Sequence, residues 1–343
     1  MIDLGSILKV ALDNKASDLH LAVGLPPILR IDGILVRTDE PDIDAKTIEN
    51  VLWRALSAEQ RERFERERDL DFSYDVNGAR FRVNTCYERG NVSLVARVIP
   101  AIIPSFRELL LPDIVADLTL SHSGLVIITG PTGSGKSTTL ASVIERINNE
   151  QPVSITTLED PIEFLFSSKK AKVTQRELGG DMRTFADGLK HVLRQDPNVI
   201  MVGEMRDPET IATTLTLAET GHLVFSTLHT PSAAQAIDRI IDSFPPFQQT
   251  QIRAQMALSL KAVISQHLLP REGGGRVAAR EVLLNTPAVG NLIRENKVAQ
   301  IPNVMQTSLS SGMFTLSQNL RDLVKEGLVA KDIATAYLPP DIM

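Results

Sequence analysis

Eight consecutive residues, Gly130-Pro-Thr-Gly-Ser-Gly-Lys-Ser137, have the spacing of a loop that binds nucleoside triphosphate. Glycines let such a loop curve tightly, so that backbone N–H groups and the start of the following helix face an anion. The run before the loop is apolar, and the run after it, Thr138–Ile147, is compatible with a helix. In this context the pattern predicts that Lys136 reaches the β- and γ-phosphates and that Ser137 ligates Mg²⁺.

The loop is expected to bind ATP through a continuous set of residues. A glycine-rich turn without a ligand is the alternative, but the flanking strand and helix argue against it. The residues expected to contact the nucleotide are Gly130, Pro131, Thr132, Gly133, Ser134, Gly135, Lys136, Ser137 and Thr138.

Acidic residues follow two other apolar runs. Glu204 comes just after Val199–Val202, as in a Walker B strand that ends in Glu, and we expect it to support Mg²⁺ through water. The second cluster, at 159–163, contains Glu163, which we favour as the group that polarises the attacking water. The two acids could divide these tasks differently, and Asp160, ahead of Pro161, could instead cap a helix.

Two histidines, His222 and His229, bracket the apolar run Leu223–Ser226. An imidazole near a γ-phosphate can donate a hydrogen bond and so report that the phosphate is present. Isolated histidines are more often structural, so the argument depends on their spacing around a strand expected to lie parallel to the strand before the loop. We expect both to read the γ-phosphate.

The elements that must position these groups alternate along the chain from about residue 113. Short apolar runs separated by helical stretches are typical of a parallel sheet covered on both faces, which predicts an α/β domain over 113–343. The expected strands are Leu125–Thr129, Ser154–Leu158, Val199–Val202 and Leu223–Ser226. Gly273–Gly275 indicates a later hairpin or loop, and residues 287–336 are expected to be helical.

Residues 1–99 predict a smaller α+β domain. Asp32-Gly33 and Asn77-Gly78 are hairpin signals, and Ser57 with Gln60 forms a capping-box pattern. After the second turn, Arg82 shares a polar strand face with Arg80 and Asn84, and the strand at 92–99 carries Arg97. Prolines at 100, 104 and 112 predict an interdomain linker over 100–112.

Composition excludes several classes of protein. The 343 residues carry a formal net charge of −6 and no aromatic–basic stretch, which argues against a nucleic-acid partner. The only cysteine, Cys86, excludes a disulfide framework and a four-cysteine zinc site within one chain. The start of the chain is not a secretory signal, and nothing approaches the ~18 apolar residues of a transmembrane segment. We expect a cytoplasmic protein whose membrane association requires a partner.

Together the motifs resemble the type II/type IV secretion ATPase superfamily, and within it the type IV pilus retraction ATPases. The four sequence motifs of the family occur in order: the phosphate loop at 130–137, the acidic box at 157–163, the Walker B-like segment at 199–208 and the histidine box at 221–230. The resemblance covers essentially the whole chain. It implies a PAS-like N-terminal domain, a RecA-like ATPase domain, a homohexameric ring and a nucleotide bound between the two domains. It also implies that Arg82 and Arg97, with Arg80 as a lesser candidate, approach the phosphates, and that Arg194 and Arg206 act as sensors.

The resemblance further implies a motor that hydrolyses ATP, rotates its domains and powers pilus retraction and twitching motility. Its partners would be an inner-membrane pilus platform protein and, as a further candidate, a paralogous retraction ATPase, which would place it peripherally at the inner membrane. In Ala288–Glu295, Val289 and Gly290 replace the Ile and Arg of the family's AIRNLIRE motif. A related secretion or DNA-uptake ATPase and a nucleotide-binding regulatory paralogue therefore stay open as alternatives.

Overall fold

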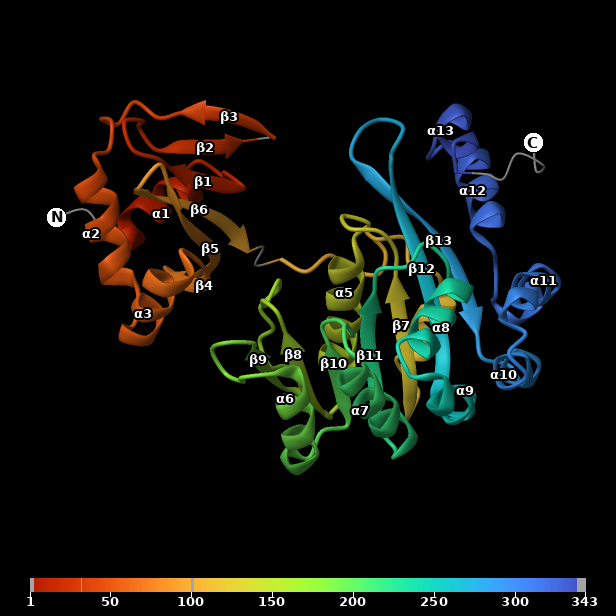
Figure 1. Ribbon diagram of the computed structural model, residues 1–343. Coiled ribbons are helices and arrows are strands. Elements are labelled where there is room, and N and C mark those ends of the chain that lie inside the picture. Colours follow the sequence, from red (N-terminus) through yellow and green to blue (C-terminus); the bar gives the residue numbers. More distant parts are fainter. Residues whose placement is uncertain (1–2, 32, 100–101, 338–343) are drawn as a thin grey trace. The chain divides into compact units, whose positions relative to one another are not determined.

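Two compact units make up the computed structural model, which describes residues 3–31, 33–99 and 102–337 (Figure 1). The first unit runs to Ile102 and includes Glu163–Leu165; the second comprises Ile103–Ile162 and the chain from Phe166 onward. Most of the segment predicted as a linker therefore groups with the second unit. Pro100, which belongs to that prediction, lies outside the described residues, as does Asp32 of the first hairpin turn.

The first unit is built on a six-stranded antiparallel sheet with the strand order β3-β2-β1-β6-β5-β4. Side chains such as Phe81 and Val83 alternate into one face, where they share a core with the three helices, whereas Arg82 points to the other face. The α+β prediction for this unit is confirmed. Its elements are α1 (Leu4–Asp13), β1 (Asp18–Leu21), β2 (Ile28–Ile31), β3 (Ile34–Arg37), α2 (Ala45–Ala55), α3 (Ala58–Glu67), β4 (Asp69–Val76), β5 (Ala79–Glu88) and β6 (Asn91–Ile99).

Local signals in the first unit form as the sequence predicts. Ser57 and Gln60 make the reciprocal hydrogen bonds of a capping box at the start of α3. Asn77 and Gly78 both have positive φ angles, 50° and 77°, which the tight turn between β4 and β5 requires. The hairpin fixes the register of β5 against its neighbours, and Arg82 consequently lies directly opposite Arg97 of β6.

The second unit contains a seven-stranded sheet with the strand order β13-β12-β7-β11-β10-β8-β9. Every neighbouring pair is parallel except β12 and β13, which form a long antiparallel hairpin. The predicted parallel α/β sheet is confirmed, and the hairpin turns at the predicted glycines, Gly273–Gly275. The strands are β7 (Gly124–Thr129), β8 (Ser154–Glu159), β9 (Lys172–Glu177), β10 (Val199–Val202), β11 (Leu223–Leu228), β12 (Leu260–Pro270) and β13 (Arg276–Leu284).

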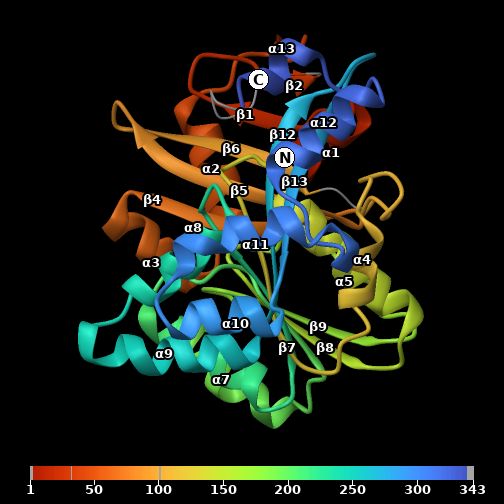
Figure 2. The same ribbon diagram turned by 90° about the vertical axis from the view of Figure 1, so that its right-hand side faces the viewer.

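Helices cover both faces of this sheet. Leu125 and Ile127 point into a core with α6–α11, whereas Val126 and Ile128 point into a second core with α4 and α5 (Figures 1 and 2). A third cluster joins α12 and α13 to the hairpin. The helices are α4 (Asp113–Leu118), α5 (Lys136–Glu150), α6 (Phe185–Val192), α7 (Pro208–Glu219), α8 (Ala233–Asp242), α9 (Pro246–Ser259), α10 (Pro287–Arg294), α11 (Ile301–Thr307), α12 (Leu316–Lys325) and α13 (Lys331–Thr335).

Candidate active site

Four motif segments meet at one edge of the second sheet. The strands β7, β11, β10 and β8 are adjacent in that order and parallel, so their carboxyl ends share an edge. The phosphate loop follows β7, His229 follows β11, Glu204 follows β10 and Asp160 follows β8. Ligands of open α/β sheets bind outside the carboxyl ends of the strands, so this edge is the candidate active site.

The phosphate loop has a backbone that its glycines make possible. Gly130, Gly133 and Gly135 have positive φ angles of 144°, 78° and 86°. A Cβ on Gly130 would also come within 2.2 Å of the backbone oxygen of Gln266, so only glycine fits there. Helix α5 then begins without a side-chain cap. A helix start of this kind is suited to an anion, which fits the phosphates of ATP.

Lys136 is buried, with 8% of its surface exposed, and it is the first residue of α5. Its Nζ donates hydrogen bonds to the carbonyl oxygens of Gly130 and Pro131, both at 2.9 Å. The amine is thus held over its own loop, where bound phosphates would meet it.

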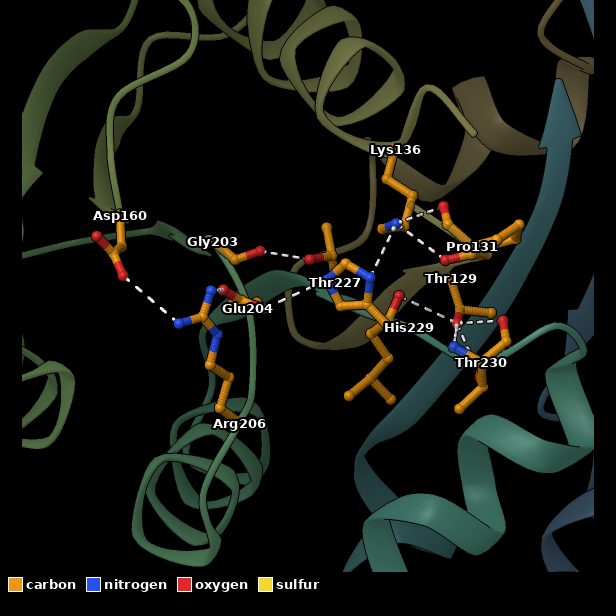
Figure 3. A network of polar contacts seen from close by, with 12 residues as sticks. Thr129, Pro131, Lys136, Asp160, Gly203, Glu204, Arg206, Thr227, His229 and Thr230 are labelled. Atoms are coloured by element: carbon orange, nitrogen blue, oxygen red, sulfur yellow. Dashed lines mark hydrogen bonds and ion pairs between the residues drawn. The ribbon is translucent and has the colours of Figure 1, made fainter. Parts of the chain in front are cut away.

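His229 links Lys136 to Glu204 (Figure 3). Its Nδ1 lies 3.4 Å from Lys136 Nζ, and its Nε2 lies 3.3 Å from Glu204 Oε2. A protonated lysine amine can only donate hydrogen bonds, so His229 Nδ1 accepts one from Lys136. The other ring nitrogen, Nε2, then carries the hydrogen and donates a hydrogen bond to Glu204. A neutral imidazole in this tautomer satisfies both contacts and joins the phosphate-binding lysine to the acid.

Glu204 continues the chain of contacts on its other side. Its side chain is 14% exposed and pairs with the Arg206 guanidinium, which also lies 3.7 Å from Asp160 Oδ2. The hydrogen bond to Glu204 raises the pKa of Arg206, with a further contribution from the charge of Asp160. The order Lys136, His229, Glu204, Arg206, Asp160 follows the order of the strands along the sheet edge (Figure 3).

Threonines fix the loops on which these groups stand. The Thr129 hydroxyl at the end of β7 accepts from the backbone N–H of Thr230 at 2.9 Å and lies 2.8 Å from the Thr230 hydroxyl. Thr227 Oγ1 donates to the carbonyl oxygen of Gly203 at 2.5 Å. The segments that carry His229 and Glu204 are therefore tied to each other and to the phosphate loop strand.

The acids of the box at 157–163 lie in different surroundings. Glu159 is buried and accepts hydrogen bonds from Thr157 Oγ1 at 2.6 Å and Gln175 Nε2 at 3.0 Å. Asp160 joins the network through Arg206, whereas Glu163 is exposed and groups with the first unit. The contacts that start at Lys136 lead to Glu204 rather than to Glu163.

His222 requires a correction. It precedes β11, whose first residue, Leu223, pairs with Gly124 at the start of β7, so it lies at the amino edge of the sheet. Six strand residues of about 3.3 Å each separate it from His229, a distance of about 20 Å. Its Nδ1 instead contacts the carbonyl oxygen of Leu217 at 3.1 Å, near the end of α7. The structure therefore does not place His222 at the phosphate loop of its own chain.

The predicted arginines of the first unit lie on neighbouring strands. Arg97 is ion-paired with the buried Asp18 at 2.7 Å, and Arg82 lies 3.6 Å from Asp71. Their side chains are 70% and 45% exposed. Arg80 pairs with Asp75 at 3.3 Å and is less exposed. In the second unit, Arg194 is exposed and lies between α6 and the start of β10.

Sequence reasoning missed Gln266. It is buried in β12, accepts a hydrogen bond from Thr139 Oγ1 at 3.0 Å and donates to the carbonyl oxygen of Ser134 at 2.7 Å. It thereby braces the phosphate loop and the start of α5 from the side opposite His229. The available signal was one glutamine inside the apolar run of a strand.

The site residues can bind Mg²⁺ only if phosphate oxygens of ATP and water supply the remaining ligands. Within the described ranges, His, Cys, Asp and Glu do not gather in threes that could hold a metal ion. Mg²⁺ typically keeps several waters and binds through one or two protein groups together with phosphate oxygens. Ser137, beside Lys136 on α5, and Glu204 are donors of this kind. As a separate finding, each helix in residues 3–31, 33–99 and 102–337 is too short or too polar to cross a bilayer.

Known proteins match the chain along almost its whole length. It is 46% identical over 334 residues to the Type IV pilus retractation ATPase PilT of Pseudomonas aeruginosa, covering 97% of each chain. It is 48% identical over 310 residues to a twitching motility protein of Neisseria gonorrhoeae, covering 90% of this chain and 83% of that protein. The crystal structure of the pilus retraction motor PilT with bound ADP superposes with a TM-score of 0.93 at 46% identity, covering 100% of this chain and 99% of that one.

These matches confirm the predicted fold class, a P-loop ATPase domain of the RecA-like α/β type preceded by a smaller α+β domain. The family model described as Type II/IV secretion system protein matches residues 2–273. The chain therefore belongs to the Type II/IV secretion system protein family.

Proposed function

We propose that the chain is the subunit of a homohexameric motor that hydrolyses ATP and powers type IV pilus retraction. The observation that carries the ATPase assignment is the series of contacts from Lys136 through His229 to Glu204. These residues lie at the edge of the sheet where the phosphate loop leads into α5. The likeness to the retraction motor with bound ADP supports ATP as the substrate and pilus retraction as the work.

The phosphate loop binds the phosphates, and Lys136 exchanges the carbonyl oxygens of Gly130 and Pro131 for phosphate oxygens. Its charge then offsets the negative charge that grows on the transferred phosphoryl group, an electrostatic contribution to catalysis. Mg²⁺, when bound, would supply further neutralisation of the phosphate charge. Ser137 and Glu204 would hold it, Glu204 through water.

Two acids share the remaining work in this proposal. Only the His229 imidazole separates Glu204 from Lys136. Because Lys136 binds the phosphates, this arrangement favours a position of Glu204 beside the γ-phosphate. Glu163, exposed in the acidic box, polarises the attacking water. His229 reads the γ-phosphate, because a phosphate oxygen drawn to Lys136 would compete for the amine that His229 Nδ1 contacts.

The first unit contributes Arg82 and Arg97 to the phosphates, and it has a PAS-like fold. Both arginines are exposed enough to exchange their carboxylate partners for a phosphate. Loss of the γ-phosphate then rotates the first unit against the second, and a segment that contains prolines at 104 and 112 acts as the hinge. Sequential hydrolysis around the ring turns these rotations into work.

The proposed partners are an inner-membrane pilus platform protein and, as a further candidate, a paralogous retraction ATPase, so the motor works in the cytoplasm at the inner membrane. The alternatives are a secretion or DNA-uptake ATPase and a regulatory paralogue. One observation bears on them: Gly290, where the family motif has Arg, is buried in α10, and an added Cβ would lie 3.4 Å from the Ala257 carbonyl oxygen. Helix α10, which carries this motif, is thus altered on its packed face.

Phosphate release by the purified chain with Mg²⁺ tests the ATPase assignment. Lys136→Ala should lower turnover by at least 10²–10³-fold, the order expected for a preorganised group that stabilises transition-state charge. Lys190→Ala is the matched control, because Lys190 is an exposed lysine paired with Glu209. Near-normal turnover in Lys136→Ala would refute the active-site assignment, and a solution mass of one subunit with ATP present would refute the hexamer.

Deletion of the gene tests the direction of work. Hyperpiliated cells that do not twitch support retraction. Normal pili with a defect in secretion or DNA uptake support the second candidate instead.

A further inference from the structure

The loop after β11 carries His229 and leads into α8, which begins at Ala233. His229 keeps its contacts with Lys136 and Glu204 only while this loop holds its position. Small displacements of a catalytic group are costly, since an error of ~1 Å can lower a rate by about 10²-fold. The residues that hold the loop therefore bear on hydrolysis even where they do not contact the nucleotide.

A row of three polar side chains faces this loop, one from each of the adjacent strands β7, β12 and β13. Thr129 lies directly beside Ser265 in the parallel pair, and Ser265 lies directly opposite Glu281 in the hairpin. Residues paired in this way point to the same face of a sheet. The register of the two strand pairs therefore places the three side chains side by side.

The first two members of the row hydrogen-bond successive residues of the loop. Thr129 Oγ1 accepts from the backbone N–H of Thr230 at 2.9 Å (Figure 3). The Ser265 hydroxyl donates to the carbonyl oxygen of Pro231 at 3.0 Å, and His267 Nε2, also on β12, donates to the same oxygen at 3.2 Å. Proline has no N–H, so its carbonyl is the backbone group by which this part of the loop can be held.

Glu281 is the outermost member of the row, on the edge strand β13. Its Oε1 accepts from the backbone N–H of Ala233, the first residue of α8, at 2.7 Å. The carboxylate also accepts from the backbone N–H of Leu316, the first residue of α12. Burial raises the pKa of Glu281, while these two hydrogen bonds and the charge of His267 act against that rise. A carboxylate between two helix starts is suited to fix both, because helix N-termini attract negative charge.

We propose that Glu281 is a positioning residue for ATP hydrolysis, which keeps the loop of His229 in place by fixing the start of α8. The proposal rests on the ATPase function proposed above. Glu281 does not contact the nucleotide in it, since the carboxylate acts through Ala233 and the loop. A role confined to anchoring α12 is the competing explanation, because Leu316 takes the same carboxylate.

A double-mutant cycle on the full chain, measured as phosphate release with Mg²⁺–ATP, separates these roles. Glu281→Gln keeps the size of the side chain but leaves one oxygen for two N–H donors. It should lower kcat about tenfold and change KM for ATP less than about twofold, since the bond from Gln266 to the phosphate loop is untouched. In the His229→Gln background the same substitution should lower kcat less than about twofold, because the loop no longer carries the group that Glu281 positions.

Asn319→Ala is the matched control. Asn319 Oδ1 accepts from the backbone N–H of Arg280 at 2.8 Å, so this variant loosens α12 on β13 and leaves the ties of the His229 loop intact. Its kcat should stay within about twofold of the wild type. A tenfold loss in Asn319→Ala would assign the effect to α12 and overturn the positioning role.

A second variant acts on the same loop from β12. Ser265→Ala/His267→Ala removes both donors to the Pro231 carbonyl oxygen and should also lower kcat, again with little further loss in the His229→Gln background. This variant carries the test if Glu281→Gln does not fold, which thermal unfolding followed by circular dichroism shows.

The outcomes separate the inference from the function on which it rests. Wild-type turnover in Glu281→Gln, or the same fold-loss with and without His229, refutes the positioning role and leaves the ATPase assignment standing. If the wild-type chain releases no phosphate, the ATPase function fails and the inference fails with it.

Discussion

The charged residues of the two units are held in different ways. In the second unit, Lys136 and Glu204 are mostly buried, and their partners lie in the loops that follow three different strands, β7, β11 and β10. In the first unit, Arg82 and Arg97 are largely exposed and lie opposite each other on adjacent strands. The first arrangement is a preorganised site, in which mutation of one charged side chain leaves its buried partners without a hydrogen bond. The second is a pair of movable charges: the Arg82–Asp71 pair is exposed on both sides and contributes only about 0–1 kcal/mol, and Arg97 is itself exposed although its partner Asp18 is buried.

The largest effect should follow a change in the buried network. Glu204→Gln keeps the shape of the side chain and removes its charge, so the variant should bind ATP and hydrolyse it on the order of 10²–10³-fold more slowly. Nucleotide binding and phosphate release measured on the same preparation check this. Glu209→Gln, which changes an exposed acid, is the control.

Glu163→Gln sharpens the comparison of the two acids. If Glu163 polarises the water, this variant should lose hydrolysis as severely as Glu204→Gln. Normal cycling in Glu204→Gln would contradict its assigned role and make Glu163 the leading acid.

A smaller effect is expected from the movable charges. Arg97→Ala and Arg82→Ala should each lower hydrolysis by about 10- to 100-fold, below the 10³–10⁵-fold of an inserted arginine finger. Arg66→Ala, another exposed arginine of the first unit, should have no effect. If all three variants hydrolyse ATP equally well, Arg82 and Arg97 are surface residues without a role in catalysis.

Sequence patterns predicted those features of the second unit that depend on a single continuous segment of the chain. The apolar strands, the phosphate loop and the acid after β10 each depend on a few neighbouring residues. Strand β9 was missed because Lys172–Glu177 is polar and lies at the sheet edge, where it pairs with β8 alone. The brace by Gln266 joins segments more than 100 residues apart, which no local pattern specifies.

The two histidines show a limit of motif reasoning. His222 and His229 stand in one box, and their spacing around one strand suggested one shared site. A strand of six residues lies between them, however, and the direction of parallel strands places only the later histidine at the phosphate loop. The partner of Arg97 was equally hidden, because Asp18 is 79 residues away and was not part of any motif.

The ion pair of Arg97 predicts a pH-dependent stability. Burial alone would raise the pKa of Asp18, but hydrogen bonds from Arg97 and Ser17 outweigh it, so the pKa lies below its ordinary value of 3.8. The stabilisation is therefore complete well above pH 3.8 and is lost as the pH falls through the lowered pKa. Arg97→Ala should cost about 1–3 kcal/mol at pH 7, because it removes a charged partner from the buried Asp18 carboxylate, and less near pH 2.

Urea unfolding of the wild type and the variant at both pH values measures this difference. A gap in stability that stays constant with pH would show that Arg97 acts through packing rather than through the charge of Asp18. Arg66→Ala again provides the control, because its partner Glu67 is exposed.

The smallest effect on the nucleotide should come from His222. His222→Gln removes a contact with the Leu217 carbonyl oxygen at the amino edge of the sheet, about 20 Å from the phosphate loop. It should cost about 1 kcal/mol of stability and leave ADP affinity of the isolated subunit within about twofold. His229→Gln breaks the link between Lys136 and Glu204 and should lower hydrolysis clearly more. If His222→Gln abolishes hydrolysis only in the assembled ring, the amino edge must act on a neighbouring subunit; if it does so without a ring, the placement of His222 is wrong.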